Sequence, residues 1–241
     1  MNAALEVRDL TKRYGRALAL DAVSLTLDIG ASTALIGVNG AGKSTLFRCL
    51  LDLQGIDAGV VRILGTDHRE PRARVPLAWL PERFVPPAYA TGREVLAQLC
   101  DLHGVAYHED AALAECRALD LAAEALTSRT ATYSKGMAQK LGLIACLLAQ
   151  RPLLLLDEPM SGLDPLAHEL FRRRLARLKE TGTTLFFSTH ALADAQALCE
   201  SLVWLDAGRV RYAGPVSALA GTVPTGILSD AFISAVRHPP P

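Results

Sequence analysis

The sequence predicts an α/β fold: a mostly parallel core sheet with an N-terminal antiparallel β subdomain and an inserted helical subdomain. Three observations support this class. Strand and helix patterns alternate along most of the 241 residues. Leu153–Leu156 is a fully apolar run, as expected of a central parallel strand covered on both faces. Residues 5–10 and 23–29 instead alternate apolar and polar side chains, which is typical of antiparallel strands with one wet face.

The elements before the four-leucine strand follow from the same patterns. Further strands are expected over residues 33–36, 60–64 and 77–80, and a helix over about 42–53. After residue 82 the character of the chain changes, because Pro86 and Pro87 interrupt it and leucine and alanine then recur at helical spacing. These helical patterns lie near residues 92–103, 108–121 and 134–149. We therefore expect a helical subdomain over about residues 83–150.

The elements after that strand continue the alternation. We expect helices over about 165–180 and 191–199, and strands over 184–188, 202–206 and 209–212. The pattern predicts one folded domain over residues 1–221 and a short tail over 222–241 that ends in three prolines.

Composition excludes several classes of protein. Lys plus Arg and Asp plus Glu each number 25, so no overall basic field favours binding to nucleic acid. The five cysteines are scattered, without a CxxC pair, which indicates reduced thiols and a reducing compartment. The N-terminus does not resemble a secretory signal, and no apolar run approaches the roughly 20 residues that span a bilayer. We expect a soluble chain that reaches a membrane only through a partner.

A phosphate-binding loop is the strongest motif. Residues Gly37–Ser44 fit GxxxxGK[ST], directly after a predicted strand and directly before a predicted helix. Glycines let the backbone wrap around phosphate oxygens, and the helix N-terminus adds positive potential. Lys43 can reach the β- and γ-phosphates, and the Ser44 hydroxyl can ligate Mg²⁺. The alternative, a glycine-rich turn with a chance lysine, does not explain the strand and helix on either side.

A pair of acids follows the four-leucine strand. Asp157 and Glu158 stand at its carboxyl end, where ligands bind in open α/β sheets. Asp157 can hold Mg²⁺ and Glu158 can polarise an attacking water. The alternative is that the two acids merely end a strand in solvent, and the phosphate loop upstream argues against it.

Tyr133-Ser-Lys-Gly-Met137, followed by the leucine strand and its acid pair, resembles the ABC family of ATPases. Ser161-Gly-Leu-Asp164 and Ser188-Thr-His190 appear in that family's order and spacing. The resemblance covers roughly residues 3–220. It implies a P-loop NTPase (RecA-like) core, ATP and Mg²⁺ as ligands, and a nucleotide held between two subunits.

The resemblance also implies a role for each matching residue. Tyr14 would stack on adenine, Glu158 would be the general base and His190 the γ-phosphate sensor. Asp164 would lie at the interface and transmit between the two sites. The phosphates would be held by Gly37, Val38, Asn39, Gly40, Ala41, Gly42, Lys43, Ser44 and Thr45. The metal would be set by Ser44, Asp157 and Glu82. The signature residues would close on the ATP that is bound to the second subunit; they are Ser134, Lys135, Gly136 and Met137. The other histidines have no metal-ligand spacing, and no role is assigned to them: His68, His103, His108, His168 and His238.

Two departures from the family's common pattern indicate a subgroup. The signature is Tyr-Ser-Lys-Gly-Met where Leu-Ser-Gly-Gly-Gln is usual, and Glu82 stands where a metal-binding glutamine is usual. Both changes, and the tail motif Leu228-Ser-Asp-Ala-Phe-Ile233, resemble a branch of bacterial exporter ATPases whose membrane subunit is a separate chain.

This resemblance predicts an ATPase that powers a transmembrane permease subunit from the cytoplasmic face of the bacterial inner membrane. We expect a homodimer, and pairing with a paralogue stays open. The loop and helices after Glu82, over about residues 83–105, would form the docking cleft for the permease. Trp79, Phe84 and Tyr89 would give it an aromatic neighbourhood, or else these aromatics simply pack the helical lobe. The rival hypothesis is a soluble mechanical ABC ATPase acting on ribosomes or DNA. Such mechanical ATPases usually carry two ATPase cassettes in one chain, a long coiled-coil insert or a markedly basic surface, and this sequence has none of these features.

Overall fold

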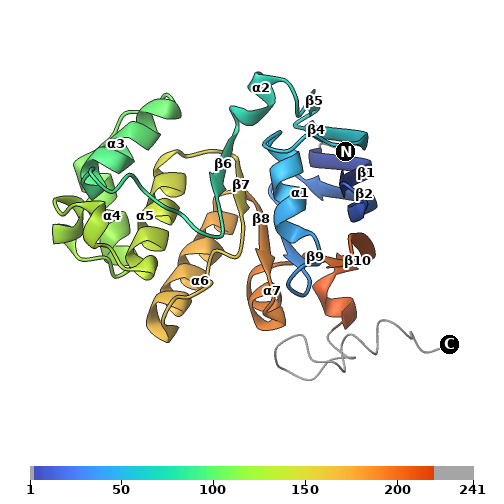
Figure 1. Ribbon diagram of the computed structural model, residues 1–241. Helices are drawn as coiled ribbons and strands as arrows, with labels where there is room; N and C mark the ends of the chain where they lie inside the picture. Colours follow the sequence, from blue (N-terminus) through green and yellow to red (C-terminus); the bar gives the residue numbers. More distant parts are fainter. Residues whose placement is uncertain (1–2, 220–241) are drawn as a thin grey trace.

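Six strands form the core sheet of the computed structural model, which describes residues 3–219 (Figure 1). Their order is β10-β9-β3-β8-β7-β6. The parallel members are β3 (Ser32–Ile36), β6 (Leu77–Leu80), β7 (Leu153–Leu156), β8 (Thr184–Thr189) and β9 (Ser201–Asp206). The edge strand β10 (Arg209–Pro215) pairs with β9 in the antiparallel direction. The mostly parallel core sheet that the sequence predicts is confirmed.

A second sheet, of antiparallel strands, is built from the N-terminal part of the chain. Its order is β2-β1-β4-β5. The strands are β1 (Ala3–Tyr14), β2 (Ala17–Asp28), β4 (Ala58–Ile63) and β5 (Thr66–Asp67). Along β2, Val23, Leu25 and Leu27 are buried while the residues between them are exposed. The alternation in the sequence therefore reports one buried face and one wet face, as expected.

The core sheet is covered on both faces, and β7 shows this most clearly. Leu153 and Leu155 belong to an apolar cluster with the N-terminal sheet and helix α1 (Lys43–Leu50). Leu154 and Leu156 belong to the opposite cluster, with α5 (Lys135–Leu148), α6 (Pro165–Glu180) and α7 (Leu192–Leu198). Since successive side chains on a strand point to opposite faces, the four leucines pack alternately into the two apolar clusters.

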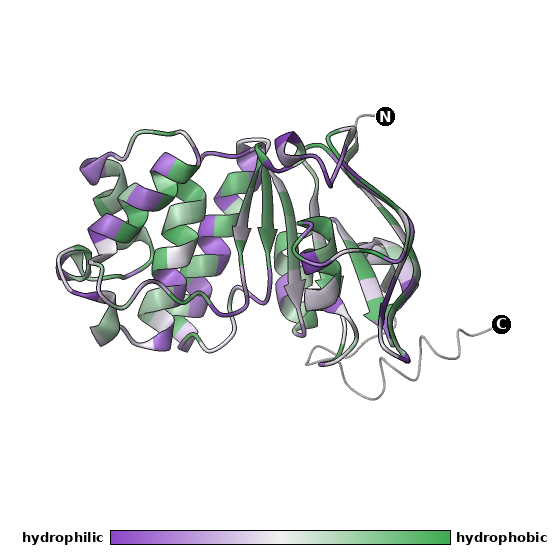
Figure 2. Cartoon of the chain, turned by 45° about the horizontal axis from the view of Figure 1, so that its top comes forward, coloured by the Kyte–Doolittle hydropathy of each residue, from purple (hydrophilic) through white to green (hydrophobic). Residues whose placement is uncertain are grey.

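The helical subdomain lies on one side of the core sheet and the N-terminal sheet on the other (Figure 1). It contains α3 (Gly92–Leu102), α4 (Glu109–Ala118), the 3₁₀ helices η1 (Ala123–Leu126) and η2 (Thr130–Thr132), and α5. A capping box between Thr91 and Glu94 fixes the start of α3. In Figure 2 hydrophobic and hydrophilic segments alternate along these helices, as expected of amphipathic helices that pack on one face.

Some details differ from the expectation. Helix α1 ends at Leu50 rather than near residue 53, because Asp52 takes a left-handed backbone (φ 57°) that no helix continues. The short strand β5, helix α2 (Pro71–Arg74) and the terminal 3₁₀ helix η3 (Val216–Leu219) have no clear pattern in the sequence. No helix among residues 3–219 is long and apolar enough to cross a bilayer. The boundary expected at residue 221 and the motif Leu228–Ile233 lie outside the described residues.

Candidate active site

Three neighbouring strands of the core sheet carry the site. The phosphate loop follows β3, the acid pair follows β7, and His190 follows β8, which lies between them in the sheet. Because parallel strands end at the same edge, residues from distant parts of the sequence meet there. This placement brings together the loop, Glu158 and His190, which the sequence assigned to one site.

The phosphate loop depends on close backbone packing. Gly42 has a φ of 109° and forms the N-cap of α1, a conformation that disfavours side chains. At Gly37 a Cβ atom would collide with the main-chain oxygen of Leu205 on β9. The loop therefore lies closely against β9 at Gly37.

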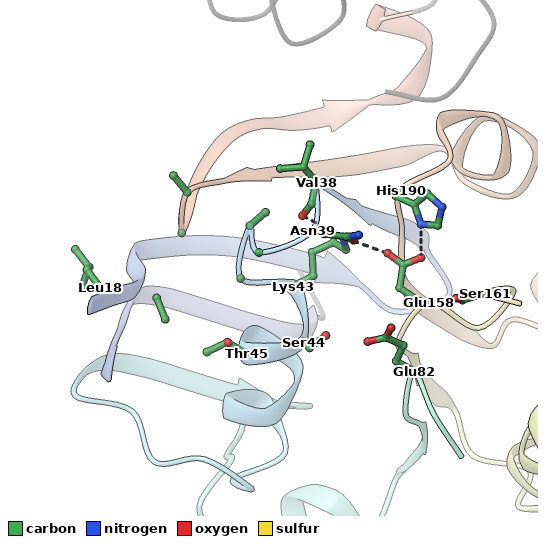
Figure 3. Close-up of a pocket in the computed structure, with 16 residues that line it drawn as sticks. Leu18, Val38, Asn39, Lys43, Ser44, Thr45, Glu82, Glu158, Ser161 and His190 are labelled. Carbon is green, nitrogen blue, oxygen red and sulfur yellow. Dashed lines mark hydrogen bonds and ion pairs between the residues drawn. The ribbon is translucent and has the colours of Figure 1, made fainter. Parts of the chain in front are cut away.

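Lys43 links the loop to the acid pair. Its Nζ donates to the main-chain oxygen of Gly37 at 2.7 Å and lies 3.1 Å from Glu158 Oε1. The contact with Glu158 is an ion pair without hydrogen-bond geometry. Both side chains are almost fully buried, so the pair is little screened by solvent. Figure 3 shows Lys43 reaching across the pocket to Glu158.

Glu158 is held from three sides. Its other oxygen, Oε2, is 2.9 Å from Nδ1 of His190. An ionised carboxylate can only accept, so Nδ1–H of His190 donates. The Glu158 amide donates to Ser188 Oγ at 2.7 Å, and its φ of 43° lies in the left-handed region that non-glycine residues rarely adopt. A strained residue fixed by several partners is typical of a functional site.

Asp157 lies deeper, beside the same serine. The Ser188 hydroxyl donates to Asp157 Oδ1 at 2.6 Å. Burial raises the pKa of Asp157, while hydrogen bonds from Ser188 and Ser44 lower it and the charges of Glu82 and Glu158 raise it. A buried carboxylate at this position is the kind of group that a bound cation would stabilise.

Lys43, Glu158 and His190 border a pocket of about 490 Å³, within the usual range for ligand pockets, whereas Gly37 and Asp157 do not line it. Val38–Thr45, Glu82, Glu158 and His190 line it. In Figure 3 the Glu82 carboxylate faces the side of the pocket where Ser44 lies. Sequence reasoning missed Leu18, Ala19, Ser161, Ala207 and Gly208, which complete the wall. Only Ser161 carried a signal, since it stands in the motif that contains Asp164.

The donor set beside Ser44 fits a magnesium ion. The Ser44 hydroxyl and the carboxylates of Asp157 and Glu82 are hard oxygen donors, which Mg²⁺ prefers, and Mg²⁺ usually takes further ligands from water and substrate phosphates. Within residues 3–219 no cluster of three or more His, Cys, Asp or Glu side chains forms an all-protein metal site.

Several predicted site residues lie elsewhere. Tyr14 does not border the pocket; it is half-exposed at the end of β1, with Lys12 Nζ 5.6 Å from its ring centroid. Ser134 and Lys135 line a separate hollow on the helical subdomain, and Ser134 accepts a hydrogen bond from the Met137 amide as the N-cap of α5. Asp164 caps α6 by accepting from the Ala167 amide at 2.9 Å, which lowers the pKa of its carboxyl. Within one chain these residues do not meet the phosphate loop.

The three aromatic residues near the helical subdomain do not form one surface. Trp79 packs against Phe47 with ring centroids 5.2 Å apart, and Phe84 packs against the core of the helical side. Tyr89 alone of the three is exposed, at 80%. The expected packing on the helical lobe therefore holds for Phe84, whereas Trp79 packs on the opposite side, in the core shared by the N-terminal sheet and α1.

Comparison with known proteins relates this chain to one family. A family model described as ABC transporter matches residues 20–161, more than half of the chain. The ABC-type transporter ATP-binding protein EcsA of Bacillus subtilis is 35% identical over 222 residues, which make up 89% of this chain and 88% of that protein. The Nod factor export ATP-binding protein I of Rhizobium meliloti is 32% identical over 211 residues, 86% of this chain and 63% of that protein.

A solved structure gives the same result. The ATP-binding subunit of an ABC transporter matches with a TM-score of 0.86 and 32% identity, covering 98% of this chain and 100% of that one. The chain spans less than two thirds of the length of several curated relatives, for example 58% of an ATP-binding protein of Synechocystis.

Proposed function

This chain belongs to the ABC transporter family, and on that premise we propose that it hydrolyses ATP with Glu158 as general base to power a separately encoded membrane subunit. ATP binding and hydrolysis are the activity of the family's cassette. The observation that carries the assignment of residues is the chain of contacts from Lys43 to Glu158 to His190 at the edge of the core sheet.

The first step is binding of the triphosphate. Lys43 would exchange the Glu158 carboxylate for phosphate oxygens, since both are anions and the loop amides favour the phosphates. Tyr14 would stack on the adenine from the end of β1. Ser44, Asp157 and Glu82 would hold the Mg²⁺, which when bound neutralises phosphate charge.

The second step is attack by water. Once Lys43 has turned to the phosphates, Glu158 would keep only His190 as a side-chain partner and could accept a proton from the attacking water. With Nδ1–H of His190 donated to Glu158, a neutral ring would present Nε2 as an acceptor. Donation from Nε2 to the γ-phosphate would therefore need the doubly protonated ring.

The signature residues support a dimer. Ser134–Met137 begin helix α5, and their hollow is separate from the pocket of the phosphate loop. If the serine hydroxyl and the helix N-terminus are to reach a γ-phosphate, that phosphate must belong to a second subunit. We expect two copies of this chain, with each ATP held between the loop of one and the signature of the other. Asp164, at the start of α6, would lie at the interface.

The membrane partner and the direction of transport are inferred from subgroup features. Lys135, Met137 and Glu82 depart from the family's common pattern as in exporter ATPases, and one relative bears the name of a Nod factor exporter. The chain would then bind a permease at the cytoplasmic face of the bacterial inner membrane. Exposed Tyr89 would contact it.

The test is Glu158→Gln. It should lower the rate of ATP hydrolysis by roughly 10²–10⁴-fold, the usual contribution of general-base catalysis, while ATP binding is retained. The matched control is Glu124→Gln, which changes an exposed glutamate of the helical subdomain and should hydrolyse ATP at the wild-type rate. An unchanged rate in Glu158→Gln would remove Glu158 as the base.

Membrane fractionation tests the transport assignment separately. Co-expression with the permease should move the chain from the supernatant to the membrane pellet and change its ATPase rate. Recovery in the supernatant or on ribosomes, with the permease present, would favour the mechanical ATPase instead.

A further inference from the structure

His168 and Asp194 join the first turn of α6 to the first turn of α7. His168 Nε2 lies 3.2 Å from Asp194 Oδ2. Because an ionised carboxylate can only accept, Nε2–H of His168 donates. The Asp194 side chain is 8% exposed and that of His168 is 36% exposed, so the carboxylate end of the bond is buried and the imidazole end is partly open to water. We propose that this pair is a positioning device that holds His190 against Glu158 and links it to Asp164.

The α7 end of the pair lies next to His190. Residue 191 is the N-cap of α7, so His190 immediately precedes the helix. The turn is shaped by hydrogen bonds from the Ala191 amide to Thr189 Oγ1 at 3.0 Å and from the Asp194 amide to the Ala191 oxygen at 3.2 Å. A shift of Asp194 would therefore move the backbone that carries the His190 ring.

The α6 end lies next to Asp164. Asp164 is the N-cap of α6, and the His168 amide donates to its main-chain oxygen at 2.9 Å. His168 is thus one helical turn from the residue proposed to meet the second subunit. A displacement of Asp164 on dimer closure would reach Asp194 through the side chain of His168.

The His190 ring has little else to fix it. Its side chain is 54% exposed, and its ring is hydrogen-bonded to Glu158 at 2.9 Å. Glu158, His190, His168 and Asp194 all line one pocket of about 250 Å³ on the far side of Glu158 from the phosphate loop. His168 and Asp194 therefore share a pocket with Glu158 and His190 but do not line the pocket of the phosphate loop.

This inference rests on the proposed role of His190, and the experiment separates the two. His168→Ala should lower kcat for ATP hydrolysis about tenfold or more while KM for ATP changes less than about twofold, because misplacement affects the reacting geometry and not the binding of phosphate. His168→Gln, whose amide can donate in place of Nε2–H, should restore kcat to within about threefold of wild type.

A double variant tests the route. If His168 acts through His190, His168→Ala/His190→Ala should be no slower than His190→Ala alone. The control on the same helix is Arg173→Ala, which removes an exposed ion pair with Glu169 and should leave kcat unchanged. Thermal unfolding of each variant verifies that it is folded.

The outcomes are distinct. If kcat falls in His190→Ala but stays at the wild-type value in His168→Ala, the positioning inference is overturned and the proposed function is left intact. A further loss in the double variant, or no rescue by glutamine, also overturns it. A wild-type rate in His190→Ala would instead refute the proposed role of His190 itself.

Discussion

Lys43 Nζ lies 3.1 Å from Glu158 Oε1, so the cation of the phosphate loop is paired with the carboxylate at the end of β7. The two residues stand 115 positions apart in the chain and meet because β3 and β7 flank β8. The carboxylate proposed as general base is thus paired with the lysine proposed to hold phosphate. This competition has a measurable consequence.

Glu158→Gln should bind ATP more tightly than the wild-type chain. The neutral amide gives Lys43 a weaker partner, so less free energy is spent in turning Lys43 to the phosphates. We expect Kd for ATP to fall by about three- to tenfold, which is about 1 kcal/mol. Titration calorimetry measures it, with Glu124→Gln again as the control. An unchanged or higher Kd would show that the Lys43–Glu158 pair does not oppose binding.

Ser188→Ala should weaken the folded state. Ser188 Oγ donates to Asp157 at 2.6 Å and accepts from the buried Glu158 amide at 2.7 Å, and alanine leaves both without this partner. The free energy of unfolding should fall by about 1–3 kcal/mol. Urea denaturation measures the change. Ser128→Ala removes an exposed hydroxyl that donates to the main-chain oxygen of Glu124, and it should lower the free energy of unfolding far less.

Arg174→Ala should loosen the contact between the helical subdomain and the core. Arg174 on α6 donates to both oxygens of Glu115 on α4, at 2.7 and 2.6 Å, and both side chains are mostly buried. We expect the free energy of unfolding to fall by about 1–3 kcal/mol, between the values for exposed and buried pairs. Arg173→Ala removes an exposed ion pair with Glu169 on the same helix, and it should lower the free energy of unfolding by less than about 0.5 kcal/mol. Equal losses in the two variants would contradict a special role for the Arg174 contact.

The five cysteines should be unreactive in the folded chain. All are free and buried; burial raises the pKa of Cys49 and Cys116 to about 11 and of Cys146 and Cys199 to about 12, and it also raises the pKa of Cys100. Since the thiolate is the reactive form, a thiol reagent at pH 8 should label the native protein slowly and all five thiols after denaturation. Rapid labelling of the native chain would contradict this burial.

The same shifts predict how stability depends on pH. A thiol whose pKa is higher in the folded state favours folding fully below the unfolded value of 9.0, and this contribution is lost as pH rises toward about 11. The free energy of unfolding should therefore decline between pH 9 and 11. Replacing Cys146 by alanine should make that decline shallower. Urea denaturation at pH 8 and pH 10.5 compares the two proteins.

Much of the site could be predicted because its chemistry is local in sequence. The phosphate loop needs glycines, a lysine and a serine within eight residues, and each glycine has a backbone reason to be there. Asp157 and Glu158 stand directly after an apolar strand, which places them at a sheet edge. Leu18 and Ala19 could not be found in this way, since a pocket wall of aliphatic side chains has no distinctive pattern.

The pairings between distant residues were not predictable from residue types. His168 has no signal of its own, because one histidine on a helix is compatible with many surroundings. Its contact with Asp194 depends on how α6 and α7 pack against one face of the core sheet.

The sequence by itself determined the fold class, the phosphate loop and the identity of the acids beside it, since hydrophobic periodicity and glycine placement act over a few residues. The tertiary structure decided which charged groups meet. Lys43, Glu158 and His190 come together through the strand order β3-β8-β7, which sequence separation does not encode. Electrostatic interactions depend on distances of a few ångströms, so only the packed sheet sets the partner of each charge.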